Sequence, residues 1–170
     1  FDHARDDAEQ IRDETLRILE NPEPVDPSEA ERYVLTSEGS YITRVVDDGA
    51  AMYYSAINEI GPAQKEKALQ FSRLDPLLRY ITDANPLVAQ SYVNTYDTML
   101  RLYPNFSVAD AFPPDSDVRD FNFFYLADAE HNPDRATLWT PVYVDPVGQG
   151  WITSVISPVY RGDTLEAVAA

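Results

Sequence analysis

The sequence predicts an α+β fold in which helices pack on an antiparallel sheet, and three observations support this class. Segments typical of helices come first, up to Asn85-Pro86, and alternating segments typical of strands follow them. Short turns of the kind that join antiparallel neighbours separate the last strands, as at Arg161-Gly162-Asp163. At 170 residues the chain is long enough for one domain with a hydrophobic core, and a second complete domain is not expected.

Residues 1–20 predict a helix whose apolar positions follow a heptad-like spacing. The stripe consists of Ala4, Ala8, Ile11, Thr15 and Ile18. Two interpretations are open: the buried face of an amphipathic helix, or a seam against the same helix of a second chain, which would make a homodimer. The buried face is favoured, because a coiled coil needs about three to four heptads. Asn21-Pro22 ends this helix.

Further helices are expected where an N-cap residue or glycine precedes a proline in the first helical turn, at Asp26-Pro27, Gly61-Pro62 and Asp75-Pro76. The segment 37–60 is left unassigned, since SYITRVV and AAMYYSAI suit helix and strand equally.

Alternation predicts the first clear strand over residues 87–96, with Gln90, Tyr92 and Asn94 among the side chains on one face. A second strand is expected over residues 98–103, and FNFFYLADA, residues 121–129, predicts a short aromatic helix.

Residues 139–160, WTPVYVDPVGQGWITSVISPVY, predict a β-hairpin with aromatic and polar side chains on the same face. Alternation places Trp139, Pro141, Tyr143 and Asp145 on one side of a single strand, and residues 145–150 supply the turn. A hairpin of this kind carries no catalytic chemistry by itself, so a binding surface is expected. The last strand is expected to pair with residues 164–170.

Composition excludes several classes of function. A net charge of −16 repels phosphate backbones and anionic lipid surfaces, so no nucleic-acid partner is expected. The absence of cysteine excludes disulfides, thiolate metal sites and a cysteine nucleophile. No run of 18 apolar residues is present, so no segment of this chain is expected to span a membrane.

Three segments together resemble the extracytoplasmic Cache sensor domains of bacterial transmembrane receptors, and the double Cache form in particular. They are NPLVAQSYVNTYDTMLRLYPNF (85–106), FNFFYLADAEHNP (121–133) and the hairpin segment, within residues 75–170. The resemblance implies a PAS-like sheet and a single sensor domain over residues 1–170. It implies that residues 1–20 are the family's long N-terminal helix and residues 85–170 the sheet and ligand pocket. The chain is then the membrane-distal half of a double Cache region.

The resemblance also implies a function: a periplasmic or extracellular module of an inner-membrane receptor that binds a small molecule and catalyses nothing. Flanking membrane helices would anchor it and couple it to a histidine kinase, a diguanylate cyclase or a chemoreceptor. No cofactor is implied. Amino-acid-sensing members carry an Arg followed by Trp-Tyr before the hairpin, whereas Phe121–Tyr125 contains no Arg and Arg119 lies out of register. Amino-acid recognition is therefore not expected.

Six residues are expected to contact the ligand between the sheet and the short helix, because aromatic walls with a few polar groups suit small-molecule sites. They are Tyr92, Asn94, Tyr125, Trp139, Tyr143 and Asp145. The alternative for the aromatic residues is core packing, and the alternative for Asp145 is a hydrogen bond within its own turn.

Two other classes of function stay open. A structural or adhesive surface domain would bind no small ligand, and a carboxylate-dependent enzyme could use a pair such as Asp128 and Glu130. The enzyme is disfavoured, since 29 acidic residues create many accidental pairs and His131 has no Ser or Cys partner in its neighbourhood of the sequence. No metal is expected, because the acids at 115 and 117 lack the Gly and distal Glu of a calcium loop.

Overall fold

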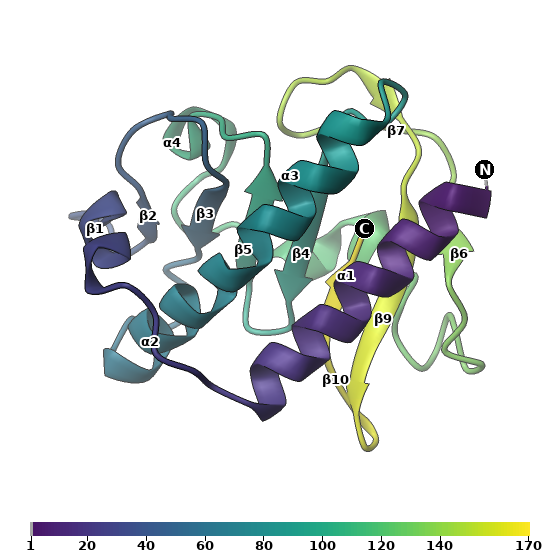
Figure 1. The fold of residues 1–170 in the computed structure, drawn as a ribbon, viewed down its shortest axis with the longest axis horizontal. Helices are drawn as coiled ribbons and strands as arrows, with labels where there is room; N and C mark the ends of the chain where they lie inside the picture. The colour runs from purple at the N-terminus through teal and green to yellow at the C-terminus, as the bar shows by residue number, and fades with distance from the viewer. Residues whose placement is uncertain (1) are drawn as a thin grey trace.

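The computed structural model describes residues 2–170, in which an eight-stranded sheet forms the centre of the fold. The strand order is β1-β2-β3-β5-β4-β10-β9-β6, every pairing is antiparallel, and β7 and β8 form a separate two-stranded sheet. Helices cover the large sheet (Figure 1). The predicted α+β class is therefore confirmed.

The strands are β1 (Tyr33–Leu35), β2 (Tyr41–Thr43), β3 (Ala51–Tyr54), β4 (Ser91–Thr95), β5 (Met99–Tyr103), β6 (Leu138–Trp139), β7 (Tyr143–Val144), β8 (Trp151–Ile152), β9 (Val155–Arg161) and β10 (Thr164–Ala169). The α-helices are α1 (Asp2–Glu20), α2 (Pro62–Phe71), α3 (Asp75–Ala84), α4 (Val108–Ala111) and α5 (Asn122–Tyr125). Three 3₁₀ helices are η1 (Pro27–Arg32), η2 (Ser72–Leu74) and η3 (Val118–Asp120).

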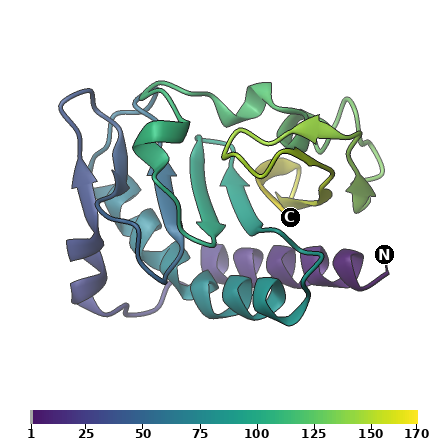
Figure 2. The ribbon, with the colours of Figure 1, turned by 90° about the horizontal axis from the view of Figure 1, so that it is seen from above.

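The two faces of the sheet carry different layers. Figure 2 shows α1 and α3 side by side beneath the sheet, and α4, α5 and the β7–β8 hairpin above it. The core beneath the sheet includes Ile11, Phe71 and Leu78, and the core above it includes Phe124 and Val168. The layer above the sheet consists of short elements and loops, and it is here that the sequence predicted the ligand residues.

Helix α1 lies across β9 and β10 of its own chain. Four residues of its stripe, Ala8, Ile11, Thr15 and Ile18, are buried there, and the Thr15 hydroxyl donates to the Ile11 carbonyl at 2.7 Å. Packing within one chain therefore accounts for this part of the stripe. Phe1 lies outside the described residues. Within residues 2–170, no helix is both long enough and apolar enough to cross a lipid bilayer.

The unassigned segment 37–60 forms β2 and β3, which continue the large sheet beyond β5. All the residues of both strands are buried, so side chains on both faces are covered. A strand covered on both faces shows no alternation of apolar and polar residues, and sequence periodicity could not separate it from a buried helix.

The expected single strand from residue 137 to residue 145 is wrong. Its first part, β6, pairs with β9 in the large sheet, and its second part, β7, pairs with β8 in the small sheet. Pro141 lies between the two parts and has no N–H to continue a ladder. The Thr140 N–H donates to the Ser154 carbonyl at 2.8 Å, and the Ser154 N–H donates to Thr140 Oγ1 at 3.0 Å. The change of direction after Thr140 separates the side chains of Trp139 and Tyr143, which were expected to share a face.

Candidate functional site

A small cavity beneath the β7–β8 hairpin brings together four of the six predicted ligand residues. Its volume is about 20 Å³, which suffices for one ordered water molecule. The predicted residues that line it are Tyr92, Asn94, Tyr143 and Asp145. Strands β4 and β5 form its floor, Phe123 of α5 forms part of its wall, and residues 145–147 form its roof. We call this cavity the chamber.

Ring contacts and the hydrogen bonds of one serine fix the aromatic side chains that line the chamber. The ring of Phe123 lies 5.8 Å from the ring of Tyr92 and 5.6 Å from the ring of Tyr143. Ser154 Oγ accepts a hydrogen bond from the Tyr92 hydroxyl at 2.8 Å and bonds the Tyr143 hydroxyl at 2.8 Å. Burial raises the pKa of both tyrosines above the ordinary value, well above it for Tyr92. Both hydroxyls therefore stay protonated and neutral.

The polar atoms of the chamber include two buried carbonyl oxygens without a hydrogen-bond partner among the described residues. These are Asn94 Oδ1 and Gln90 Oε1. Gln90 Nε2 donates to Asp145 Oδ1 at 3.3 Å, and the Gln149 N–H donates to Asp145 Oδ2 at 3.0 Å. No Lys or Arg lines the chamber, so it offers mainly hydrogen-bond acceptors to a guest.

Asp145 combines the two roles that the sequence left open. Its carboxylate accepts the N–H of Gln149 in its own turn, and it also lines the chamber with 5% of its surface exposed. Sequence analysis did not single out Gln90, Phe123 or Ser154 as site residues. The alternation over residues 87–96 placed Gln90 on the same face as Tyr92 and Asn94, and that pattern could have identified it.

The structure places the other two predicted residues outside the chamber. Tyr125 follows Phe123 and Phe124 in α5 but is 37% exposed, and its ring lies 5.3 Å from the ring of His131. Trp139 lies on β6 and lines a different and larger cavity.

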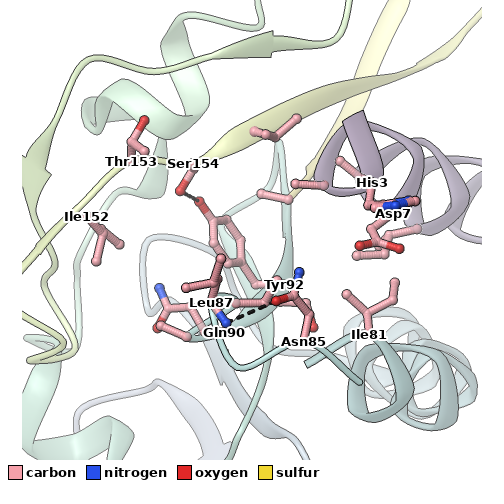
Figure 3. Close-up of a pocket in the computed structure, with 18 of the residues that line it drawn as sticks. His3, Asp7, Ile81, Asn85, Leu87, Gln90, Tyr92, Ile152, Thr153 and Ser154 are labelled. Carbon is pink, nitrogen blue, oxygen red and sulfur yellow. Dashed lines mark hydrogen bonds between the residues drawn. The ribbon is translucent and has the colours of Figure 1, made fainter. Parts of the chain in front are cut away.

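That larger cavity is a groove of about 610 Å³ between α1, the end of α3 and β8. Figure 3 shows His3 and Asp7 of α1 facing Ile81 of α3, with Tyr92 and Ser154 farther along the groove. Tyr92 and Gln90 line the groove as well as the chamber, so the two cavities share a wall. We call this cavity the groove.

Asp128, considered for an enzyme, and Asp117, considered for a metal site, serve local structure. Asp128 Oδ1 accepts the N–H of Glu130 at 2.9 Å and the N–H of His131 at 2.8 Å, which caps a turn. Asp117 accepts a hydrogen bond from Arg119 Nε at 2.8 Å. Within residues 2–170, no three His, Asp or Glu side chains lie close enough together to hold a metal ion.

Comparison of the chain with protein-family models, with curated proteins and with solved structures finds no match. The class of protein must therefore be argued from the fold and its cavities.

Proposed function

We propose that this chain is a small-molecule-sensing domain of the Cache type with a PAS-like sheet, exposed outside the cytoplasm by a bacterial transmembrane receptor. The order of the last five strands of the large sheet supports the fold. When only the strands of the large sheet are numbered from β4 onward, the order β5-β4-β10-β9-β6 is second, first, fifth, fourth, third. This is the order of PAS-like sheets, in which the first and last strands lie side by side at the centre. Strands β1 to β3 extend the sheet beyond this unit.

The observation that carries the function is the pair of buried acceptors, Asn94 Oδ1 and Gln90 Oε1, in one chamber. A buried carbonyl without a donor costs about 1–3 kcal/mol, and folded proteins rarely keep such groups without a use for them. Two of them beside the Asp145 carboxylate form a site for a ligand that donates hydrogen bonds. The aromatic rings of Phe123 and Tyr143 would cover the apolar part of the ligand.

A ligand larger than water requires the roof of the chamber to move, because the present volume is about 20 Å³. The roof belongs to the β7–β8 hairpin, whose strands have two residues each and pair only with each other. A two-stranded ladder is marginally stable by itself, so the contacts of Tyr143 and Asp145 with the rest of the chain set the cost of opening the roof. In this proposal the hairpin is the element that admits the ligand and closes over it.

The position of Tyr92 supports a route for the signal. Its N–H donates to the Ala170 carbonyl at 2.7 Å, and the Ala170 N–H donates to the Tyr92 carbonyl at 2.9 Å. Strand β10, which ends at Ala169, packs against α1. A ligand that binds the open and closed chamber with different affinity would shift β10 and α1 together. In the full-length receptor α1 would pass that shift to the membrane or to the same helix of a second subunit.

A ligand screen tests the proposal. Thermal melts with amines, organic acids, sugars and nucleobases should reveal at least one stabilising compound, since a ligand that binds only the folded state raises stability by mass action. The stabilisation should disappear in Asn94→Leu and persist in Tyr125→Ala, because Tyr125 is an aromatic residue of the same region outside the chamber. A compound whose effect survives Asn94→Leu and is lost in Tyr125→Ala would contradict the assignment of the chamber.

A further inference from the structure

The groove has the size and lining of a second ligand site, separate from the chamber. Its volume of about 610 Å³ falls within the range of roughly 300–1,000 Å³ that small-molecule pockets occupy. Buried apolar side chains, among them Ile11, Ile81 and Val155, line it. Trp139 and Trp151 also line it, and Trp151 is 75% exposed. A large indole left exposed beside an apolar cavity is typical of a binding surface.

The charged side chains that line the groove favour a cationic ligand over an anionic one. No Lys or Arg lines it, and Asp7 is the acidic side chain in its lining. Figure 3 shows the Asp7 carboxylate on the groove side of α1, next to His3. Among the described side chains, none makes a hydrogen bond or an ion pair with Asp7. Burial raises the pKa of its carboxyl group, and the charge of the neighbouring His3 partly opposes that rise. An organic anion would find no Lys or Arg there and only the titratable His3 beside Asp7, whereas a cation would find a partly buried carboxylate.

A second acceptor lies on the wall that the groove shares with the chamber. Gln90 Oε1 is buried and has no partner among the described residues, although Gln90 Nε2 is held by Asp145. Indole faces attract cations, and Trp is the strongest of the aromatic side chains in this respect. Carboxylate, carbonyl oxygen and indole all favour a positively charged donor over an anion.

We infer that the groove is a second binding site, which takes an organic ammonium ion with an apolar or aromatic body. The ammonium group lies toward Asp7, and the apolar body lies between the apolar floor and the two indoles. This site shares the side chain of Gln90 with the chamber, but its charged partner, Asp7, lines only the groove, so the inference does not rest on the function proposed for the chamber.

Three probes with one aromatic ring and different head groups test the inference: phenethylamine, phenethyl alcohol and phenylacetate. Both tryptophans of the chain line the groove, so their intrinsic fluorescence reports binding directly. Phenethylamine should change the fluorescence saturably in the millimolar range or below, and phenylacetate should bind at least about tenfold more weakly. Equal or tighter binding of phenylacetate, or no saturable change with phenethylamine, overturns the inference.

Two matched variants locate the ammonium group. Asp7→Asn should weaken phenethylamine by about tenfold and leave phenethyl alcohol unchanged, because only the charged probe loses its partner. Asp6→Asn removes the same charge from the neighbouring position of α1, which does not line the groove, and should leave both affinities within about twofold. Equal effects of the two substitutions would mean that only the overall charge matters, and this overturns the site.

Asn94→Leu separates this inference from the proposed function. Asn94 lines the chamber and does not line the groove, so phenethylamine affinity should be unchanged in that variant. Loss of phenethylamine binding in Asn94→Leu together with its retention in Asp7→Asn would place the amine in the chamber and overturn the groove as its site.

Discussion

Replacing Asn94 by Leu should raise the free energy of unfolding of the ligand-free protein, although Asn94 is 1% exposed and lies in a central strand. Its Oδ1 has no hydrogen-bond partner among the described residues, and such a buried carbonyl costs about 1–3 kcal/mol. Leu removes that cost and adds apolar volume beside a chamber of about 20 Å³ that can take part of it. Some overpacking offsets the gain, so we expect a net stabilisation of about 1 kcal/mol.

Urea unfolding measures this change, and Asn132→Leu is the matched control. Asn132 is also buried, but Asn132 Nδ2 donates to the Ala136 carbonyl at 2.8 Å and Asn132 Oδ1 accepts the Ala136 N–H at 3.0 Å. Its replacement leaves the Ala136 groups unpaired and should cost about 2 kcal/mol or more. If Asn94→Leu loses as much stability as the control, Asn94 Oδ1 is satisfied in the folded protein, and the argument for a ligand in the chamber fails.

Three further predictions concern the polar groups of the core. Arg101→Met should lower the free energy of unfolding by about 3 kcal/mol, because Asp75, which accepts a hydrogen bond from Arg101 Nε at 2.7 Å, loses its buried partner. Adding Asp75→Leu should recover part of this loss. A further loss in urea unfolding would contradict the pairing. Ser154→Ala should cost about 1–3 kcal/mol, because it leaves the hydroxyls of Tyr92 and Tyr143 only their long 3.5 Å contact with each other, so a neutral result would refute the serine as their shared partner. Burial opposes ionisation of Asp97, but Lys67 and hydrogen bonds hold the pKa of its carboxyl group below the ordinary value. The contribution of Asp97 to stability is therefore present above about pH 4 and is lost as the pH falls further. Asp97→Asn should reduce the loss of stability in acid, as measured by unfolding curves, and an unchanged pH profile would contradict this role of Asp97.

Local chemistry explains the part of the fold that the sequence could predict. Helices η1 and α2 begin at Pro27 and Pro62, as the pattern predicts, and Asp26 Oδ1 accepts the Ser28 N–H at 2.9 Å. At Asp75-Pro76 the helix begins one residue earlier than predicted, and the Asp75 carboxylate binds Arg101 and does not cap the helix. Strand β4 lies within residues 87–96, and β9 turns into β10 at Gly162, whose φ is +62°. Each of the features that match the prediction depends on neighbours in the sequence.

Features that depend on distant residues could not be predicted in this way. Arg101 is fully buried in β5, where its guanidinium binds Asp75 of α3 and Glu29 of η1. An Arg in a strand pattern is normally assigned to the solvent face, because a lone buried charge is very costly. Only the packing of these elements in three dimensions brings the two carboxylates to Arg101. In the same way, pairing with β1 and β5 places β2 and β3 in the interior of the sheet.

The sequence predicted those residues of the candidate site whose positions follow from the alternation of side chains along a strand. Tyr92 and Asn94 meet Tyr143 and Asp145 because each pair alternates along its own strand or turn, and the hairpin folds over the sheet. Trp139 lies elsewhere, because the ladder breaks at Pro141, and the length of a hairpin strand cannot be judged from alternation alone.

The break at Pro141 also explains why the protein has two cavities and not one. A continuous hairpin would have carried Trp139 and Tyr143 to the same side of the sheet, whereas the separated β7–β8 hairpin lies over the chamber and leaves Trp139 with Trp151 at the groove. Ser154, just beyond β8, lines the groove, and its hydroxyl holds Tyr92 and Tyr143 at the wall between the cavities. Any opening of the hairpin that admits a ligand to the chamber must therefore move residues that line the groove. We therefore expect ligands of the two proposed sites to affect each other through the hydrogen bonds of Ser154, and by linkage any such coupling acts equally in both directions.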